Sequence, residues 1–227
     1  MSAAPELILE AESAAEVAPA EPLAATPGTL DLRHADCMDL MREFPDKHFD
    51  LAIVDPPYGI GIASNPVRQL HDRKPWDSDI PSLEYFAELR RVSRQQIIWG
   101  GNYFPLHPSQ GFIIWDKIQP EDFSLSMCEY AWISLQTPAK MFRRSVLAEK
   151  NKIHPTQKPV ERYTWLLERY AKPGQRILDT HLGSGSHAIA CHYFGAHLTA
   201  SELDADYYAA ACARIARETA QTTLFPA

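Results

Sequence analysis

The feature that most constrains this chain is the alternation of short apolar runs with amphipathic segments along residues 30–217. The apolar runs predict strands at 31–36, 49–55, 95–100, 111–117, 130–135, 176–182 and 197–203. The amphipathic segments predict helices at 38–44, 82–94, 160–171, 186–194 and 204–217. Apolar strands separated by helices are typical of a mostly parallel sheet with helices on both faces, so the sequence predicts an α/β fold.

Outside the alternating region the composition changes. Residues 1–28 are rich in Ala, Pro and Glu, and they predict a disordered arm rather than a cleaved targeting peptide. Residues 29–220 are expected to form a single domain, with a short insert near 138–158 and a tail at 221–227. The apolar runs fall far below the roughly 20 residues of a membrane span, so we expect a soluble, cytoplasmic protein.

Charge is segregated along the chain. The net charge is -7, but residues 1–30 contain five Glu and no Lys or Arg, so the remainder is only -2. Residues 140–158, by contrast, carry a local charge of +5. The four cysteines lack paired spacing, so neither a disulfide framework nor a metal site is expected. The overall acidity therefore does not exclude a nucleic-acid partner, which requires local basic residues.

The first of two informative loops follows the strand predicted at 49–55. Its sequence is Asp55, Pro56, Pro57 and Tyr58. Two prolines stiffen the loop and donate no backbone hydrogen bonds, so the Asp55 carboxylate and the Pro56 carbonyl are available to accept hydrogen bonds from an amino group. Tyr58 offers a flat face for an aromatic ring. The alternative is a simple strand-ending turn, but the position directly after a buried strand favours a site for an amine on a planar heterocycle.

The second loop follows the strand predicted at 176–182. Asp179 ends this strand, and Gly183 and Gly185 let the backbone approach a ligand closely. Glu202 ends the next strand, 19 residues after Gly183, and an acidic residue at that offset can accept both hydroxyls of a ribose. A nucleoside-containing cofactor is therefore expected. The third glycine of a dinucleotide fingerprint is missing, which disfavours NAD.

Three motifs carry a family resemblance. DPPY after an apolar strand, HPTQKP at 154–159 and LDTHLGSGS at 178–186 resemble the DNA amino-methyltransferases, which methylate adenine N6 or cytosine N4 with S-adenosylmethionine. The order of the motifs is similar to that of the β class, whose members are circular permutations of the Rossmann-like methyltransferase fold. The resemblance extends over about residues 30–217.

The resemblance also implies roles for individual residues. Cofactor contacts are expected from Asp36 at the adenine edge, from Asp179, Gly183, Ser184 and Gly185 at the methionine part, and from Glu202 at the ribose. Lys158 is expected to face the same pocket. Asp55 to Tyr58 are expected to bind the target amine, and no metal is implied. The sequence departs from the family where DPF is usual, because Asp179 is followed by Thr180 and His181. The departure affects the packing expected around the cofactor.

Two basic segments are expected to face DNA. The first is the loop 59–80, with Arg68, Arg73 and Lys74, and the second is the stretch 140–158, with Lys140, Arg143, Arg144, Lys150 and Lys152. The second stretch lies where the family carries target-recognition residues, and its shortness predicts a short recognition sequence or weak specificity. A base stacked in duplex DNA cannot reach Tyr58, so the target nucleotide is expected to be flipped out or single-stranded.

The preferred substrate is adenine N6 in double-stranded DNA, because Asp rather than Ser begins DPPY in this resemblance. Cytosine N4 is the close alternative. RNA and protein amides remain open, as does a catalytically idle DNA-binding module of the same fold. Cytosine C5 is disfavoured, since that reaction uses a nucleophilic Cys after Pro and the chain has no Pro-Cys pair. A homodimer and a restriction partner are suggested by family analogy alone.

Overall fold

A computed structural model describes residues 26–61, 79–122, 126–145 and 153–220. These residues form one eight-stranded sheet in the order β1-β8-β7-β2-β3-β5-β4-β6. The strands are β1 (Leu30–His34), β2 (Phe49–Val54), β3 (Ser93–Trp99), β4 (Phe112–Asp116), β5 (Cys128–Ile133), β6 (Lys140–Arg143), β7 (Arg176–Asp179) and β8 (His197–Glu202). Only β5 runs antiparallel to its neighbours, so the expectation of a mostly parallel sheet is confirmed.

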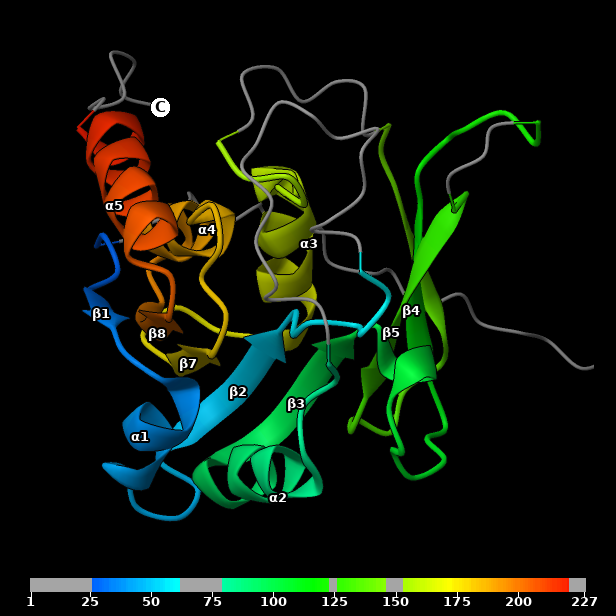
Figure 1. Cartoon of the computed structure of the whole chain (residues 1–227), viewed down its shortest axis with the longest axis horizontal. Helices are drawn as coiled ribbons and strands as arrows, with labels where there is room; N and C mark the ends of the chain where they lie inside the picture. The colour runs from blue at the N-terminus through cyan, green and yellow to red at the C-terminus, as the bar shows by residue number, and fades with distance from the viewer. Residues whose placement is uncertain (1–25, 62–78, 123–125, 146–152, 221–227) are drawn as a thin grey trace, which may run out of the picture.

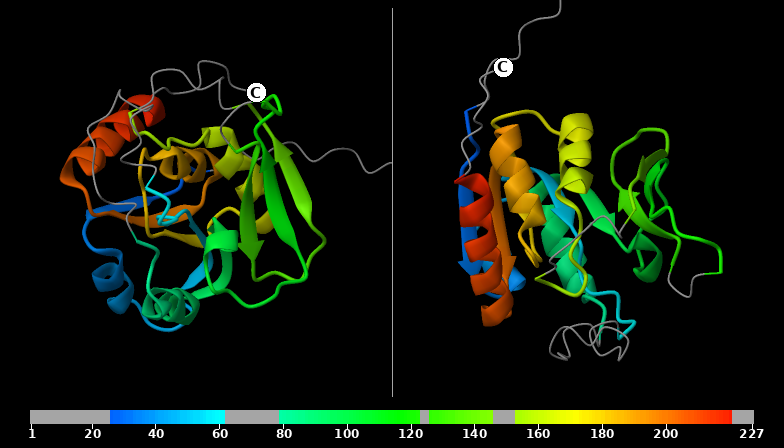
Figure 2. Two further views of the ribbon diagram at one scale, coloured as in Figure 1. Left: turned by 45° about the vertical axis from the view of Figure 1, so that its right-hand side comes forward. Right: turned by 90° about the horizontal axis from the view of Figure 1, so that it is seen from above.

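Helices cover both faces of the sheet, as expected. They are α1 (Cys37–Arg42), α2 (Leu83–Val92), α3 (Val160–Tyr170), α4 (Ser186–Phe194) and α5 (Ala205–Thr219). Helices α3, α4 and α5 lie side by side on one face, while α1 and α2 lie on the other (Figures 1 and 2). A short 3-10 helix, η3 (Gly101–Tyr103), follows β3. Each layer buries an apolar helix face against the strands, which accounts for the observed three-layer arrangement.

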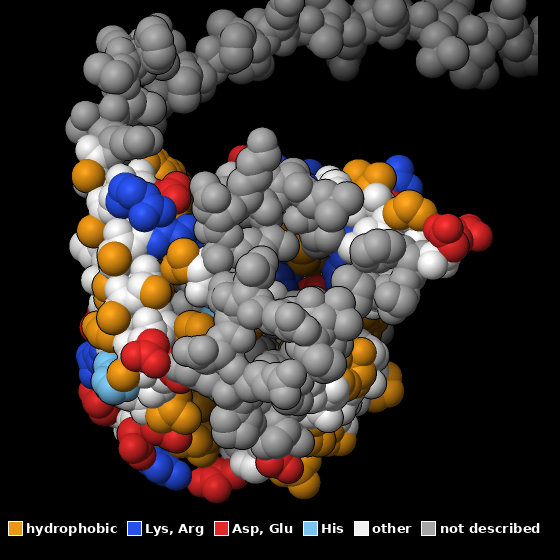
Figure 3. All heavy atoms as spheres, turned by 45° about the horizontal axis from the view of Figure 1, so that its top comes forward, with side chains coloured by type: hydrophobic (Ala, Val, Ile, Leu, Met, Phe, Trp, Pro, Cys, Tyr) orange, Lys and Arg blue, Asp and Glu red, His pale blue; other side chains and the backbone are white. Residues whose placement is uncertain are grey.

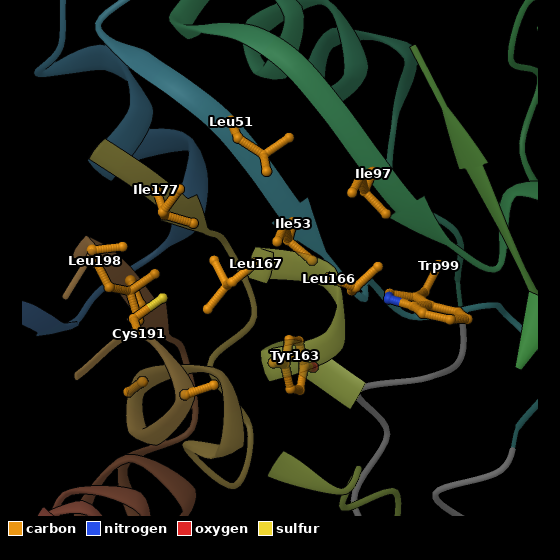
Figure 4. Packing of buried hydrophobic residues seen from close by; sticks show 14 of the residues in the cluster. Leu51, Ile53, Ile97, Trp99, Tyr163, Leu166, Leu167, Ile177, Cys191 and Leu198 are labelled. Atoms are coloured by element: carbon orange, nitrogen blue, oxygen red, sulfur yellow. The ribbon is translucent and has the colours of Figure 1, made fainter. Parts of the chain in front are cut away.

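The larger core lies under the three-helix face. Leu51 and Ile53 of β2 and Ile97 of β3 point toward Leu166 and Leu167 of α3 (Figure 4), and all five are buried. A second core under α1 and α2 contains other, mainly aromatic and aliphatic, side chains from the same strands. Because β2 and β3 contribute to both cores, the loop that follows β2 begins from the most firmly packed part of the sheet.

Helix ends are defined by conventional caps that also place site residues. Asp36 precedes α1 and its Oδ1 accepts a hydrogen bond from the Met38 backbone at 2.7 Å. Asp204 precedes α5 and accepts from two backbone N–H groups of the first turn. Pro159 precedes α3, where its fixed φ of -65° suits the start of a helix. These caps place the ends of α1, α3 and α5 next to the carboxyl ends of the parallel strands.

The expected insert near 138–158 begins with a strand that the sequence did not predict. Lys140–Arg143 forms the edge strand β6, parallel to β4, rather than part of a loop. The strand was not predicted because only Phe142 in it is buried, so the segment lacks an apolar run. Most of the predicted arm at 1–28 and the tail at 221–227 lie outside the described residues. Gly28 is described, and its backbone N–H donates to the His192 carbonyl at 3.0 Å.

Among the described residues, none of the helices has the length and apolar character needed to cross a lipid bilayer.

Candidate active site

A pocket of about 480 Å³ lies beyond the carboxyl ends of the parallel strands. Its wall is formed by the loops that follow β1, β2, β7 and β8 and by the segment that leads into α3. Seven residues that the sequence predicts for the site line it, namely Asp36, Asp55, Pro57, Lys158, Gly183, Ser184 and Glu202. The volume falls within the range of roughly 300–1,000 Å³ that is usual for small-ligand sites. The structure therefore brings the two predicted loops to one cavity.

Asp55 is the centre of a buried ionic cluster at one end of the pocket. Its Oδ1 accepts a hydrogen bond from the Tyr58 hydroxyl at 2.6 Å. Its Oδ2 accepts from Lys158 Nζ and from Arg162 Nη2, each at 2.8 Å. Arg162 is fully buried, and the side chains of Asp55 and Lys158 are only 13% and 12% exposed. Both cations therefore act on the carboxylate with little screening by solvent.

A second carboxylate balances the cations of this cluster. Glu129 of β5 lies 3.2 Å from Lys158 Nζ and 3.4 Å from Arg162 Nη1 through its Oε2. Its Oε1 pairs with Lys117 Nζ at 3.0 Å. Neither Glu129, Arg162 nor Lys117 was identified from the sequence. Arg162 did carry a signal, because it is a charged residue on the apolar face of the helix predicted at 160–171.

The cluster keeps its carboxylates ionised. Burial by itself would raise the pKa of Asp55, but the charges of Lys158 and Arg162 hold that pKa well below its usual range. Burial likewise opposes ionisation of Glu129, and the nearby Lys158 and Lys117 lower the pKa of Glu129. Burial raises the pKa of the Tyr58 hydroxyl well above its usual value, so Tyr58 keeps its proton and donates a hydrogen bond to Asp55. Asp55 is thus a charged acceptor and a weak base.

The remainder of DPPY is placed around this carboxylate. Pro57 lines the pocket and Pro56 is buried. Tyr58 stacks on Tyr103 of η3, with ring centroids 5.0 Å apart and planes at 16°. Gly100 makes that arrangement possible, because a Cβ at this position would lie 2.2 Å from the Tyr58 ring. Tyr58 therefore contributes a hydroxyl to Asp55 and one stacked face to Tyr103, and the pocket wall itself does not include its side chain.

The glycine loop forms the other end of the pocket. Glu202 Oε2 accepts a hydrogen bond from the Gly183 backbone at 2.9 Å, and Oε1 accepts from the Asp204 backbone at 3.0 Å. Gly185 begins α4 with φ at 78°, and a Cβ there would lie 2.7 Å from the Ile215 side chain. Only glycine fits both conditions. Burial raises the pKa of the Glu202 carboxyl, while the two backbone donors oppose that shift.

Asp179 lies behind this loop rather than in the pocket wall. Its Oδ1 accepts from the His181 backbone at 3.0 Å, and its Oδ2 is 2.9 Å from Nδ1 of the buried His187. Asp179 therefore supports the loop, and its expected contact with a cofactor stays a prediction. His181, at the position where the family has Phe, lines the pocket instead, and burial lowers the pKa of its imidazole.

A hydrogen-bonded link connects the glycine loop with Lys158. Arg214 of α5 is buried, and its Nη1 donates to the Ser184 carbonyl at 2.9 Å and to Ser186 Oγ at 2.8 Å. Ser186 Oγ in turn donates to the Lys158 carbonyl at 2.6 Å. Arg214 is not among the site residues predicted from the sequence, because it meets its partners only after distant segments pack together. Ser186 thus joins the two ends of the pocket, and Arg214 supports the loop that carries Ser186.

The residues expected to face DNA are only partly described. Arg68, Arg73, Lys74, Lys150 and Lys152 lie outside the described residues. Lys140 and Arg143 are exposed on β6, with Arg143 Nε 3.3 Å from Asp116, and Arg144 Nη1 pairs with Glu161 at 2.6 Å. Basic and acidic side chains are both visible in the hollow at the centre of the face in Figure 3. The described part of this surface is therefore mixed in charge rather than uniformly basic.

No three His, Cys, Asp or Glu side chains within the described ranges are grouped as a metal site would require.

Known proteins resemble this chain in sequence and in fold. A family model described as DNA methylase matches residues 113–213, somewhat under half of the chain. The Escherichia coli (strain K12) protein named "Putative methylase YubD" is 25% identical over 199 residues, which cover 80% of this chain and 88% of that protein. The matched sequence includes the segment before α3, the glycine loop and Glu202.

Two solved structures share the fold. The complex of M1.HpyAVI with SAM has a TM-score of 0.58 at 17% identity and covers 82% of this chain and 100% of that one. The PvuII DNA methyltransferase, titled cytosine-N4-specific, has a TM-score of 0.59 at 12% identity and covers 87% and 92%. The predicted methyltransferase fold is thus confirmed. In sequence, residues 113–213 are similar to the family of DNA methylases.

Proposed function

We propose that this protein transfers a methyl group from S-adenosylmethionine to the N6 amino group of adenine in DNA. One observation carries the proposal: the Asp55 carboxylate and the Gly183 loop line the same pocket. The first provides an acceptor for an amine, and the second provides the close backbone approach that a nucleoside cofactor needs. The SAM complex of M1.HpyAVI, which shares the fold, supports the choice of cofactor.

The pocket residues fit the cofactor at three points. Glu202 lines the pocket with a charged carboxylate whose remaining acceptor sites suit the ribose hydroxyls. Asp36 uses Oδ1 to cap α1, which leaves Oδ2 to accept from an adenine amino group. The backbone of Gly183 and Ser184 is available to the methionine part, with Asp179 supporting the loop from behind. When bound, the sulfonium supplies an electrophilic methyl group.

The residues at the Asp55 end orient and polarise the target amine. Asp55 and the Pro56 carbonyl accept hydrogen bonds from the amine N–H groups and thereby direct the nitrogen lone pair toward the methyl group. The surplus proton leaves after transfer, and the low pKa of Asp55 makes that carboxylate a poor final acceptor, so the proton passes to solvent. A base reaches this position only when it is flipped out of duplex DNA or already single-stranded.

Cytosine N4 is the second candidate, because the same acceptors serve either amine. The PvuII enzyme, titled cytosine-N4-specific, shares the fold over 87% of this chain. In favour of adenine stands Asp55 at the first position of DPPY, where Ser would favour cytosine.

The test is methylation of plasmid DNA from an unmethylated host with labelled S-adenosylmethionine, followed by mass spectrometry of the nucleosides. N6-methyladenine is expected. N4-methylcytosine would replace the first candidate with the second. Labelling of RNA or protein instead of DNA would overturn the substrate. Asp39→Asn, on the exposed face of α1, is the control variant and should methylate as the wild-type chain does, since Asp39 pairs only with Arg42 among the described residues.

A further inference from the structure

We propose that Arg162 is a positioning residue for methyl transfer: with Lys158 it fixes the Asp55 carboxylate so that a single acceptor site, on Oδ1, faces the target amine. This inference rests on the proposed function and adds a residue that neither the motifs nor the family match assigns. It also states which oxygen of Asp55 the amine contacts.

Most of the hydrogen-bond acceptor sites of the Asp55 carboxylate are occupied by its neighbours. An ionised carboxylate has about four lone-pair sites, two on each oxygen. Lys158 and Arg162 occupy the two sites on Oδ2, and the Tyr58 hydroxyl occupies one on Oδ1. Among the described residues these three are the partners of Asp55. One site on Oδ1 therefore remains for the amine.

Arg162 is itself held in place by aromatic rings and by its hydrogen-bond partners. Its side chain is fully buried, and its guanidinium carbon lies 4.2 Å from the centre of the Trp99 ring and 4.8 Å from that of Tyr163. Nη2 also donates to the Tyr163 hydroxyl at 2.8 Å, and Nη1 faces Glu129 at 3.4 Å. Figure 4 shows Trp99 and Tyr163 within the packed core. A planar guanidinium held between aromatic rings and two carboxylates has one orientation.

Arg162 and Lys158 differ in their access to the pocket and in the flexibility of their side chains. Lys158 lines the pocket and extends on a flexible stem, so it can change partners between Asp55 and Glu129. Arg162 does not line the pocket and keeps its contact with Oδ2 whatever the pocket contains. We infer that Arg162 holds the plane of the carboxylate while Lys158 responds to ligands. Loss of Arg162 then lowers the rate of transfer rather than the affinity for cofactor.

The experiment compares Arg162→Gln and Arg162→Lys with the wild-type chain. Single-turnover rates are measured at saturating S-adenosylmethionine and DNA, and cofactor dissociation constants are measured by calorimetry. We expect Arg162→Gln to lower the rate by about 100-fold, the size of effect that a misplaced catalytic group causes, with a cofactor Kd within about twofold of wild type. Arg162→Lys keeps a charge but not the planar fork, and about a tenfold loss is expected.

Arg169→Gln is the matched control, since Arg169 lies on the same helix but its side chain is 43% exposed. Removing a buried partner is destabilising, so thermal unfolding of each variant is recorded and rates are expressed per folded molecule. If Arg162→Gln does not fold, Arg162→Lys decides. A rate within threefold of wild type for a folded Arg162→Gln, or for Arg162→Lys when the former is unfolded, overturns the proposal.

A second readout does not depend on the substrate. Carbon-13 labelling of Asp residues reports titration of the Asp55 carboxyl, which should occur at a higher pH in Arg162→Lys and Arg162→Gln. The other groups that act on Asp55 are Lys158, Tyr58, Glu129, Tyr85, Tyr163 and His181. An unchanged titration overturns the positioning role of Arg162 even if the enzyme methylates DNA. A shifted titration in a chain that methylates no DNA supports the contact of Arg162 with Asp55 and overturns only the proposed function.

Discussion

The two ends of the pocket are built in different ways. At the Asp55 end, the position of the loop depends on charged side chains, since Lys158 and Arg162 meet the carboxylate in a buried cluster. At the Glu202 end, the loop is held mainly by backbone groups, because the Gly183 N–H donates to Glu202 and Arg214 binds the Ser184 carbonyl. The comparison suggests that the Asp55 end determines the rate and the Glu202 end the affinity for cofactor.

The difference has a physical reason. Buried charges are costly unless they are paired, but a paired cluster fixes its members in direction as well as in place. That suits a group that must point at a reacting nitrogen. Backbone amides at a glycine turn offer donors at low steric cost, which suits the binding of a flexible ligand. Substitutions at the two ends should therefore separate catalysis from binding.

The largest effect is expected for Asp55→Ala. The target amine loses its charged acceptor, and Lys158 and Arg162 are left with an uncompensated charge, so methyl transfer should fall by at least about 1,000-fold. The cofactor Kd should stay within about threefold of wild type, because the expected ribose contact comes from Glu202, on a different loop of the pocket wall. Calorimetry and single-turnover labelling measure the two quantities. An equal loss of affinity would contradict the division between the two ends.

The next largest effect is expected for Glu202→Ala. Loss of charged hydrogen bonds worth about 1.5–3 kcal/mol corresponds to a cofactor affinity weakened about 10- to 100-fold. The rate at saturating cofactor should change much less. Glu43→Ala serves as the control, since its carboxylate is exposed and pairs with Arg33. Unchanged cofactor binding would place the ribose elsewhere.

As the pH falls, Glu202 should be protonated before Asp55. Burial raises the pKa of Glu202, whereas the cations beside Asp55 lower the pKa of that carboxyl. As the pH falls, Glu202 therefore gains a proton first, and cofactor affinity declines while Asp55 is still ionised. Calorimetry between about pH 7 and pH 5 should show a pH-dependent Kd that is flattened in Glu202→Gln. A loss of rate at saturating cofactor that precedes the loss of affinity would reverse the assignment.

A smaller effect is expected for Arg214→Met. The variant removes donors to the Ser184 carbonyl and to Ser186 Oγ, which loosens the glycine loop, while Ser186 Oγ keeps its bond to the Lys158 carbonyl. Cofactor affinity should fall about 5- to 10-fold, as for one or two lost charge-assisted hydrogen bonds. Arg217→Met, on the exposed side of the same helix, should have no effect. A fall in rate without any change in Kd would indicate that Arg214 acts on the Asp55 end instead.

The smallest effect is expected for Lys140→Gln on β6. A single phosphate contact contributes little, so the KM for DNA should rise about two- to threefold and the salt dependence of binding should weaken slightly. Cofactor affinity should be unchanged. Binding to short duplexes at several salt concentrations provides the measurement. An identical salt slope in both proteins would remove β6 from the DNA-facing surface.

Much of the fold and part of the site could be predicted from the sequence. Most strands have apolar runs, and the two loops are marked by proline and glycine, which is why Asp55, Gly183 and Glu202 were identified. The edge strand β6 was missed because only Phe142 in it is buried. Glu129 and Arg214 were missed because each meets its partners only after distant segments pack together. Asp179 carries a family motif, yet its carboxylate is satisfied by His181 and His187.

A crystal structure with bound S-adenosylmethionine shows directly whether one pocket places a methyl donor opposite Asp55. We expect the ribose hydroxyls to contact Glu202. We also expect the methyl carbon to lie about 5 Å from Asp55 Oδ1, because the amine nitrogen donates to Oδ1 and attacks through a lone pair at a roughly tetrahedral angle to that N–H bond. A donor bound outside this pocket, or one with its methyl group directed away from Asp55, would contradict the account.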